Sequence, residues 1–355
     1  MRSFRDLALR TRTRARARAR WPGALALGLA LVLPLAGCAT DADRPDAAPP
    51  ASGSASGTAA SSPSPSPSPE VRAQLRVDGR TRQYLLHRPA AAAAAVADDG
   101  PRPLVIAFHG RGADAEELRE KTRLEKAAAA RGMLVAFPEG LDHGWGAGTR
   151  ATEQRPDADL DVRFTEELIR HLVRTERADP GRVYVAGFSN GGSMALRMAA
   201  ERPGLLAGAA SVSGQLPSGD AAVTPTGPVP VMVVYGADDP VRPLAGLPSP
   251  PPDPEEPILP TLSARETAEA FAAVGGAGDP VTKGEKGYDR TVWRLKAAQD
   301  EPAATVQLLV ADDAGHTWPG STVPPPEGFG PVSKALNATD TILDFLTGSG
   351  PNHSR

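Results

Sequence analysis

Gly187-Phe188-Ser189-Asn190-Gly191-Gly192 directly follows the apolar run Val183-Tyr184-Val185-Ala186 and precedes a helical pattern at residues 193–199. This is a Gly-x-Ser-x-Gly sequence placed where a strand is expected to end. On a sharp turn from a strand into a helix, a serine hydroxyl stands clear of the backbone and can attack a substrate. The flanking glycines permit backbone conformations and close approaches that a Cβ would block. The pattern predicts that Ser189 is a nucleophile.

A serine nucleophile needs a histidine and an acid, and both follow in the sequence. The motif by itself can be accidental in a chain with 36 glycines. However, an expected strand at residues 229–235 leads into Asp238-Asp239, and another at residues 306–310 leads into Gly315-His316. Serine, acid and histidine, each after its own strand, is the chain order of the α/β-hydrolases.

The chemistry assigns a role to each group. His316 is expected to take the proton of Ser189 and return it to the leaving alcohol, while the acid orients the imidazole. We choose Asp239 as the acid, with its neighbour Asp238 as the alternative.

The segment His109-Gly110-Arg111-Gly112 follows an expected strand at residues 104–108. This position corresponds to the loop that supplies one oxyanion-hole amide in α/β-hydrolases. The backbone amides of Arg111 and Asn190 are therefore the predicted oxyanion hole. The imidazole of His109 is expected to be structural rather than catalytic.

The beginning of the chain indicates export. Eight arginines precede an apolar run at residues 24–36, which is too short to span a bilayer and is typical of a secretory signal. The run ends in Leu35-Ala36-Gly37-Cys38, which resembles the lipobox of bacterial lipoproteins. In that family the cysteine is lipidated, so Cys38 is expected to anchor the exported protein at the outer face of the bacterial cell membrane, with secretion as the other possible destination. The alternative is an uncleaved anchor with an incidental cysteine.

Composition excludes several functions for the rest of the chain. Beyond residue 38 the sequence holds 31 basic and 41 acidic residues, a net charge of −10, so no nucleic-acid partner is expected. No metal cluster, dinucleotide fingerprint or P-loop is present, so neither a metal nor a cofactor is predicted.

Three further segments follow the expected signal at residues 1–38. Residues 39–70 are rich in Ser, Pro and Ala, and are predicted to form a disordered linker, either a spacer or a segment without a spacing role. Residues 71–348 are the predicted catalytic domain, and residues 349–355 a flexible tail.

Within the predicted domain, short apolar runs alternate with helical patterns. This alternation predicts an α/β fold with a mostly parallel sheet covered by helices on both faces. The expected strands are 83–87, 104–108, 134–137, 182–186, 209–212, 229–235, 291–295 and 306–310, and the expected helices are 116–131, 162–176, 191–201, 263–274 and 332–346.

Taken together, the motifs resemble the polyhydroxybutyrate depolymerases and the related feruloyl and acetylxylan esterases. The matching segments are 82–89, 109–110, 137–140 with Trp145, 161–164, 187–192, 236–241 and 315–320. The resemblance places the family's triad on Ser189, Asp239 and His316. It also implies that His109, Trp145 and Trp318 line the substrate pocket, although both tryptophans fit core packing equally well.

The chain departs from that family where a cysteine often follows His-Gly, because Arg111 stands there. An arginine at the rim of the site would favour an anionic substrate group, or it would simply face solvent. The resemblance implies an extracytoplasmic serine esterase acting on short-chain hydroxyalkanoate oligomers or on feruloyl or acetyl esters. A serine peptidase of related fold and a non-catalytic binding lipoprotein are the alternatives, and the oligomeric state stays open.

Overall fold

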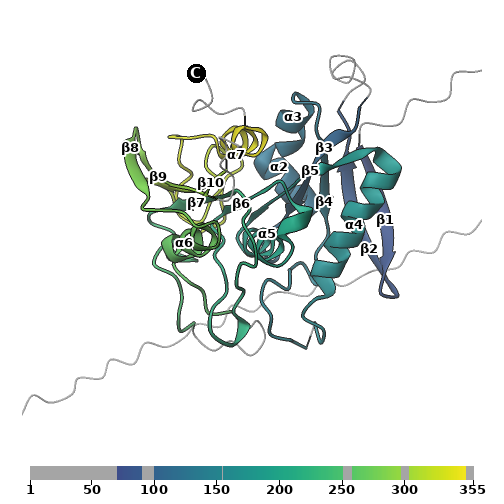
Figure 1. The fold of residues 1–355 in the computed structure, drawn as a ribbon, viewed down its shortest axis with the longest axis horizontal. Coiled ribbons are helices and arrows are strands. Elements are labelled where there is room, and N and C mark those ends of the chain that lie inside the picture. The colour runs from purple at the N-terminus through teal and green to yellow at the C-terminus, as the bar shows by residue number, and fades with distance from the viewer. Residues whose placement is uncertain (1–69, 90–99, 154, 251–257, 297–303, 349–355) are drawn as a thin grey trace, which may run out of the picture. The chain divides into compact units, whose positions relative to one another are not determined.

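The structure, a computed structural model, describes residues 70–89, 100–153, 155–250, 258–296 and 304–348 (Figure 1). The expected signal with Cys38, residues 39–69 of the expected linker and the expected tail lie outside the described residues. The first strand begins at Glu70, one residue before the expected start of the catalytic domain. Within the described part of the chain, no helix combines the length and apolar character needed to cross a membrane.

The centre of the described structure is a ten-stranded sheet in the order β1-β2-β4-β3-β5-β6-β7-β10-β9-β8 (Figure 1). The strands from β4 to β10 in this order run parallel to one another, whereas β1, β2, β9 and β8 pair antiparallel at the two ends. Their bounds are β1 Glu70–Val77, β2 Arg80–His87, β3 Arg102–Phe108, β4 Leu134–Pro138, β5 Ala178–Phe188, β6 Gly208–Val212, β7 Val231–Gly236, β8 Val281–Glu285, β9 Tyr288–Arg294 and β10 Thr305–Ala311.

Central strands are apolar on both faces because helices cover both faces. In β3, Leu104, Ile106 and Phe108 join one buried cluster, while Val105 and Ala107 point the other way and join a second cluster. This division follows from the alternation of side chains along a strand. The prediction of a mostly parallel sheet with helices on both faces is therefore confirmed.

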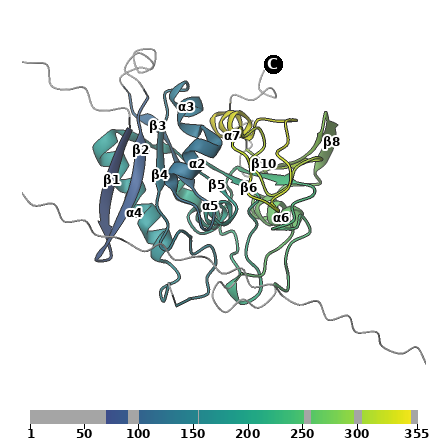
Figure 2. The same cartoon turned by 180° about the vertical axis from the view of Figure 1, so that it is seen from behind.

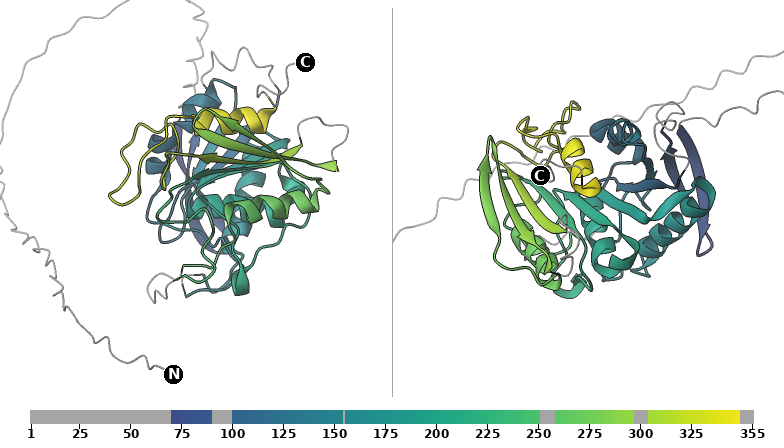
Figure 3. Two further views of the ribbon diagram at one scale, coloured as in Figure 1. Left: turned by 90° about the vertical axis from the view of Figure 1, so that its left-hand side faces the viewer. Right: turned by 45° about the horizontal axis from the view of Figure 1, so that its top comes forward.

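The helices divide between the two faces of the sheet. Helices α4, α5 and α6 pack on one face, and α2, α3 and α7 pack on the other (Figures 2 and 3). Their bounds are α2 Ala115–Thr122, α3 Leu124–Ala129, α4 Leu160–Glu176, α5 Asn190–Glu201, α6 Ala264–Val274 and α7 Ala338–Thr347.

Two predicted helices differ from the structure. The expected helix 116–131 is divided into α2 and α3 because Arg123 adopts a left-handed conformation with φ of 50°. The expected helix 332–346 begins only at Ala338, where the side chain of Asn337 accepts hydrogen bonds from the amides of Thr339 and Asp340. Both differences arise from local caps, which apolar periodicity does not reveal.

Two strands were not predicted. Strand β1 pairs only with β2, and β8 pairs only with β9, so each forms an outer edge of the sheet. Most residues of β8 are exposed, and its sequence carries no apolar alternation. Strand β8 therefore has no pattern by which periodicity could detect it, whereas β1 alternates apolar and polar residues (Val71, Ala73, Leu75 and Val77), and this alternation was missed.

A buried ion-pair cluster fixes the loop between β4 and α4. Asp161 is fully buried, and its carboxylate accepts hydrogen bonds from Arg82 at 2.8 Å, Arg155 at 2.7 Å and the Gly146 amide at 2.7 Å. Burial acts to raise the pKa of Asp161, but the two guanidinium groups outweigh it and hold this pKa below its usual value. The cluster therefore anchors the segment that carries Trp145.

Replacing Asp161 by Asn is expected to lower the free energy of unfolding by about 3–5 kcal/mol at neutral pH, because the buried guanidinium of Arg82 and the partly buried one of Arg155 lose their countercharge. Since the pKa of Asp161 is depressed in the folded protein, its stabilisation is present above the unfolded value of about 3.9 and is lost at lower pH. Urea unfolding measured at neutral pH and below about pH 4 tests both points. The difference in stability between the wild type and Asp161→Asn should shrink on acidification; an unchanged difference would contradict this account.

Candidate active site

Ser189 lies on the sharp turn between β5 and α5. Its backbone has φ of 55° and ψ of −118°, a conformation that costs a non-glycine residue about 1–3 kcal/mol. The turn is held on both sides: the Ser189 amide donates to the carbonyl of Val212 at 2.8 Å, and the Ser193 amide donates to the carbonyl of Ser189 at 3.0 Å. The residue with the strained backbone is therefore Ser189, the nucleophile predicted from the sequence.

The two glycines around Ser189 are required by close backbone approaches. A Cβ on Gly187 would lie 2.1 Å from the carbonyl oxygen of Gly191, and a Cβ on Gly191 would lie 2.2 Å from the carbonyl oxygen of Phe108. No side chain fits at either position without moving the backbone. The first turn of α5 therefore rests directly against the end of β3.

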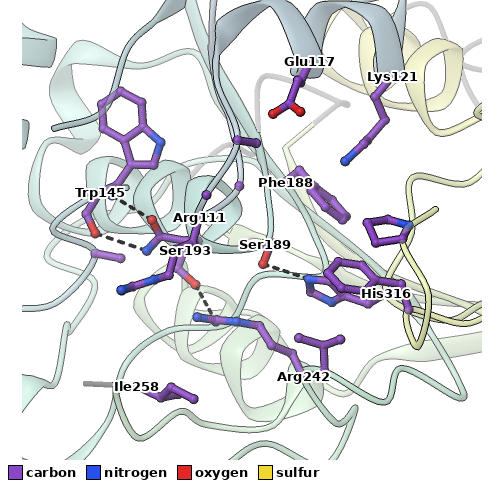
Figure 4. Close-up of a pocket in the computed structure, with 18 of the residues that line it drawn as sticks. Arg111, Glu117, Lys121, Trp145, Phe188, Ser189, Ser193, Arg242, Ile258 and His316 are labelled. Carbon is purple, nitrogen blue, oxygen red and sulfur yellow. Dashed lines mark hydrogen bonds between the residues drawn. The ribbon is translucent and has the colours of Figure 1, made fainter. Parts of the chain in front are cut away.

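The structure brings Ser189, His316 and Asp239 into one hydrogen-bonded row, and Figure 4 shows the contact between Ser189 and His316. The Oγ of Ser189 lies 2.8 Å from Nε2 of His316, and Nδ1 of His316 lies 2.8 Å from Oδ2 of Asp239. His316 is 2% exposed and Asp239 is 5% exposed. A carboxylate can only accept, so Nδ1 carries the proton and Nε2 is left to accept from the serine hydroxyl.

The carboxylate of Asp239 is fixed by its own loop. Its Oδ1 accepts hydrogen bonds from the amides of Val241 at 3.0 Å and Arg242 at 2.7 Å, which leaves Oδ2 for His316. Asp238 is exposed and makes no such contact with the imidazole. Of the two adjacent acids, the geometry favours Asp239.

His316 is held by its backbone and by two aromatic rings. Its amide donates to the carbonyl of Phe329 at 2.6 Å. The ring centroid lies 5.1 Å from that of Phe188 and 5.3 Å from that of Phe329. The imidazole therefore has little freedom to turn away from Ser189.

Ser189 and His316 open into a cavity of about 590 Å³. Its walls are largely apolar, but charged groups line it as well (Figure 4). The apolar lining residues include Trp145, Phe188, Val241, Ile258, Leu259, Val323 and Phe329, and the charged ones are Arg111, Glu117, Glu120, Lys121 and Arg242. Within the described residues, no group of three or more His, Cys, Asp or Glu side chains could hold a metal ion.

Arg111 and Asn190, the predicted oxyanion-hole residues, both line this cavity beside Ser189. The side chain of Asn190 binds the backbone of Trp145. Its Nδ2 donates to the Trp145 carbonyl at 3.1 Å, and its Oδ1 accepts from the Trp145 amide at 2.7 Å. Trp145 is fixed in this way as a wall of the cavity, and its indole also donates to the carbonyl of His109 at 3.0 Å.

Two of the predicted pocket residues do not line the cavity. His109 is fully buried: its Nε2 accepts from the Gly140 amide at 2.9 Å, so its protonated Nδ1 donates to the Gly110 carbonyl at 2.8 Å. Burial lowers the pKa of His109, in keeping with a neutral structural imidazole. Trp318 is also buried, and its indole donates to the Thr339 hydroxyl on α7 at 3.0 Å. His109 thus connects the loop after β3 to the loop after β4, and Trp318 connects the loop after β10 to α7.

Other residues that line the cavity were not predicted from the sequence, because they lie in segments without a recognisable motif. Residues of the two proline-rich segments, 243–260 and 319–331, contribute to the cavity walls through Ile258 and Phe329 among others. Arg242 follows the predicted acid Asp239 by three residues, so its position near the site could have been predicted from the sequence. Lys121 on α2 is not close in sequence to any predicted site residue.

Comparison with known proteins places this arrangement in a family. Residues 90–247 match the family model described as phospholipase/carboxylesterase. The protein named "Putative esterase NocK", from Nocardia uniformis subsp. tsuyamanensis, is 42% identical to this chain over 281 residues, which cover 77% of this chain and 81% of that protein. The chain belongs to the carboxylesterase family of α/β-hydrolases.

This carboxylesterase also matches parts of other esterases. Feruloyl esterase B from Piromyces equi is 31% identical over 148 residues, covering 40% of this chain but 27% of that enzyme. The solved structure of an acetyl xylan esterase from Aspergillus awamori aligns with a TM-score of 0.46 at 17% identity, covering 66% of this chain and 89% of that one.

Proposed function

We propose that this carboxylesterase hydrolyses esters through an acyl-enzyme, with Ser189 as nucleophile, His316 as general base and acid, and Asp239 as the orienting acid. The observation that supports this most strongly is the hydrogen-bonded row from Asp239 to Ser189 at the wall of the cavity. A neutral imidazole whose Nε2 accepts from a serine hydroxyl is the arrangement needed to remove its proton.

In the first half-reaction, Ser189 Oγ attacks the ester carbonyl carbon while its proton passes to Nε2 of His316. The negative charge that develops on the carbonyl oxygen is stabilised by the backbone amides of Arg111 and Asn190. Asp239 stabilises the imidazolium through its bond to Nδ1. The carbon–oxygen bond to the alcohol then breaks, and His316 returns the proton to the leaving oxygen.

In the second half-reaction, water replaces the alcohol. His316 takes a proton from the water as it attacks the acyl carbon, and the bond to Ser189 Oγ breaks. The serine recovers its proton from the imidazolium, and the acid is released. Neither half-reaction calls on a cofactor.

For substrates, we propose small carboxylic esters, either short hydroxyalkanoate oligomers or feruloyl and acetyl esters. A cavity of about 590 Å³ lies within the usual range of small-molecule sites, and its apolar walls suit a short aliphatic or aromatic acyl group. Partial similarity to a feruloyl esterase supports the second class.

Purified protein containing residues from about 70 onward is expected to hydrolyse p-nitrophenyl acetate and butyrate. Ser189→Ala should lower kcat by roughly 10⁴-fold or more, and Asp239→Asn by a comparable factor, because each change disables the triad. Asp238→Asn is the matched control and should keep near wild-type turnover. A wild type without esterase activity, a peptidase activity in its place, or an active Ser189→Ala variant would refute the proposal.

We further propose that the protein is exported and lipid-anchored through Cys38 at the outer face of the cell membrane. The arginine-rich start, the apolar run and the single cysteine after Leu35-Ala36-Gly37 support this. In a bacterial host the wild type should remain with the membrane fraction and be labelled by radioactive palmitate. Cys38→Ala should lose the label; equal labelling of the two proteins would contradict the proposal.

A further inference from the structure

Arg242 places a cation in the cavity, and no carboxylate of the described residues forms an ion pair with it. It follows Asp239 by three residues and is half-buried in the cavity wall. Among the described residues, the hydroxyl of Ser193 is the acceptor that its guanidinium reaches, at 3.1 Å, and no carboxylate forms an ion pair with it. That hydroxyl is neutral and already donates its proton to the carbonyl of Gln215. The carboxylate of Asp239 acts on this charge through space, but it is bonded to His316 and to two backbone amides, so within the described residues the guanidinium has no charged acceptor of its own.

The arginines that are fully buried in the described residues, Arg82 and Arg197, are neutralised. Arg82 pairs with Asp161 at 2.8 Å, and Arg197 pairs with Asp159 at 2.6 Å and with Glu201 at 2.8 Å. An unpaired charge away from water is costly, which is why such groups are normally paired. Within the described residues Arg242 forms no such pair, and it lines the cavity into which Ser189 opens.

Burial lowers the pKa of Arg242, and the positive charge of Arg111 acts in the same direction, whereas Tyr235 and the carboxylate of Asp239 act against it. Burial is the largest of these effects, so the cation is poorly solvated. A bound carboxylate would relieve this cost and form charge-assisted hydrogen bonds with the guanidinium.

Lys121 adds a second cation from the opposite wall, on α2 (Figure 4). Its ammonium lies 4.6 Å from the ring centroid of Phe188, and within the described part of the chain it forms no ion pair. Burial lowers the pKa of Lys121, against the field of Glu117. The two acids on this wall, Glu117 and Glu120, are exposed, whereas Lys121 and Arg242 are half-buried, so the less exposed charges among the described lining residues are positive.

The partner of Arg242 places its guanidinium near the reaction centre. Ser193 lies in the first turn of α5, its amide donates to the carbonyl of Ser189 at 3.0 Å, and both serines line the cavity. A carboxylate bound beside Ser193 would be joined to the scissile carbonyl by a short chain of bonds.

We propose that the substrate is an ester carrying a free carboxylate and that Arg242 is the specificity-determining residue that binds it, with Lys121 adding positive potential. This inference rests on the proposed esterase function. It favours hydroxy-acid oligomers, whose chain ends in a carboxylate, over neutral feruloyl or acetyl esters of sugars.

The test uses two matched pairs of esters that differ only in charge. On the acyl side these are the mono-p-nitrophenyl ester of adipic acid and the p-nitrophenyl ester of its neutral half-amide, adipamic acid. On the alcohol side they are 4-acetoxybenzoate and 4-acetoxybenzamide. In at least one pair, wild-type kcat/KM should be about 10-fold to 100-fold higher for the anion, the usual effect of hydrogen bonds to a charged group. Arg242→Gln should remove that preference, mainly through KM, and Arg242→Lys should keep part of it.

Arg265→Gln is the matched control, because it removes one positive charge from an exposed arginine on α6 that pairs with Glu269. It should keep the wild-type preference. Free adipate should inhibit the wild type competitively and more strongly than adipamide does, a readout that does not depend on the Arg242 variants folding.

Equal kcat/KM within both pairs in the wild type, or an equal loss for anion and amide in Arg242→Gln, would overturn the inference. The neutral esters distinguish the carboxylate proposal from the esterase proposal. If the wild type hydrolyses them but shows no preference for the anionic esters, the carboxylate proposal fails and the esterase function is retained. If no ester of either pair is hydrolysed, both proposals fail.

Discussion

The contact between the first turn of α5 and the end of β3 is the constraint on which the site depends. The backbone of Gly191 passes so close to the carbonyl of Phe108 that a Cβ would lie 2.2 Å from that oxygen. This contact fixes the strained turn at Ser189, and it sets the loop that carries Arg111 beside the nucleophile. A larger residue at Gly191 would separate α5 from the sheet and displace both halves of the expected oxyanion hole.

The remaining catalytic groups reach Ser189 because parallel strands end at one edge. Strands β5, β7 and β10 each finish in a loop at that edge, and these loops carry Ser189, Asp239 and His316. Ligand sites of open α/β sheets commonly lie there. Arg242 and Lys121 line the same cavity as Ser189 and His316. The catalytic groups and the positive charges proposed to select the substrate therefore face one bound molecule.

Sequence alone predicted the parts of the site that sit directly after buried strands. Ser189, Asp239 and His316 each follow an apolar run, and the structure joins them by hydrogen bonds. The pocket was predicted less well, because its walls come from loops packed across the fold. Trp318 follows His316 by two residues but turns toward Thr339, a contact that depends on where α7 begins. Lys121 reaches the cavity from α2, whose break at Arg123 has no counterpart in the apolar periodicity.

Direct trapping of the acyl-enzyme tests the central claim, that Ser189 carries the acyl group. The protein would be mixed with p-nitrophenyl acetate, quenched in acid during the first turnover, and analysed by intact mass and peptide mapping. We predict a burst of about one p-nitrophenolate per active site and one acetyl group on the peptide containing Ser189. An acetyl group on another residue, or full turnover by Ser189→Ala, would contradict the account.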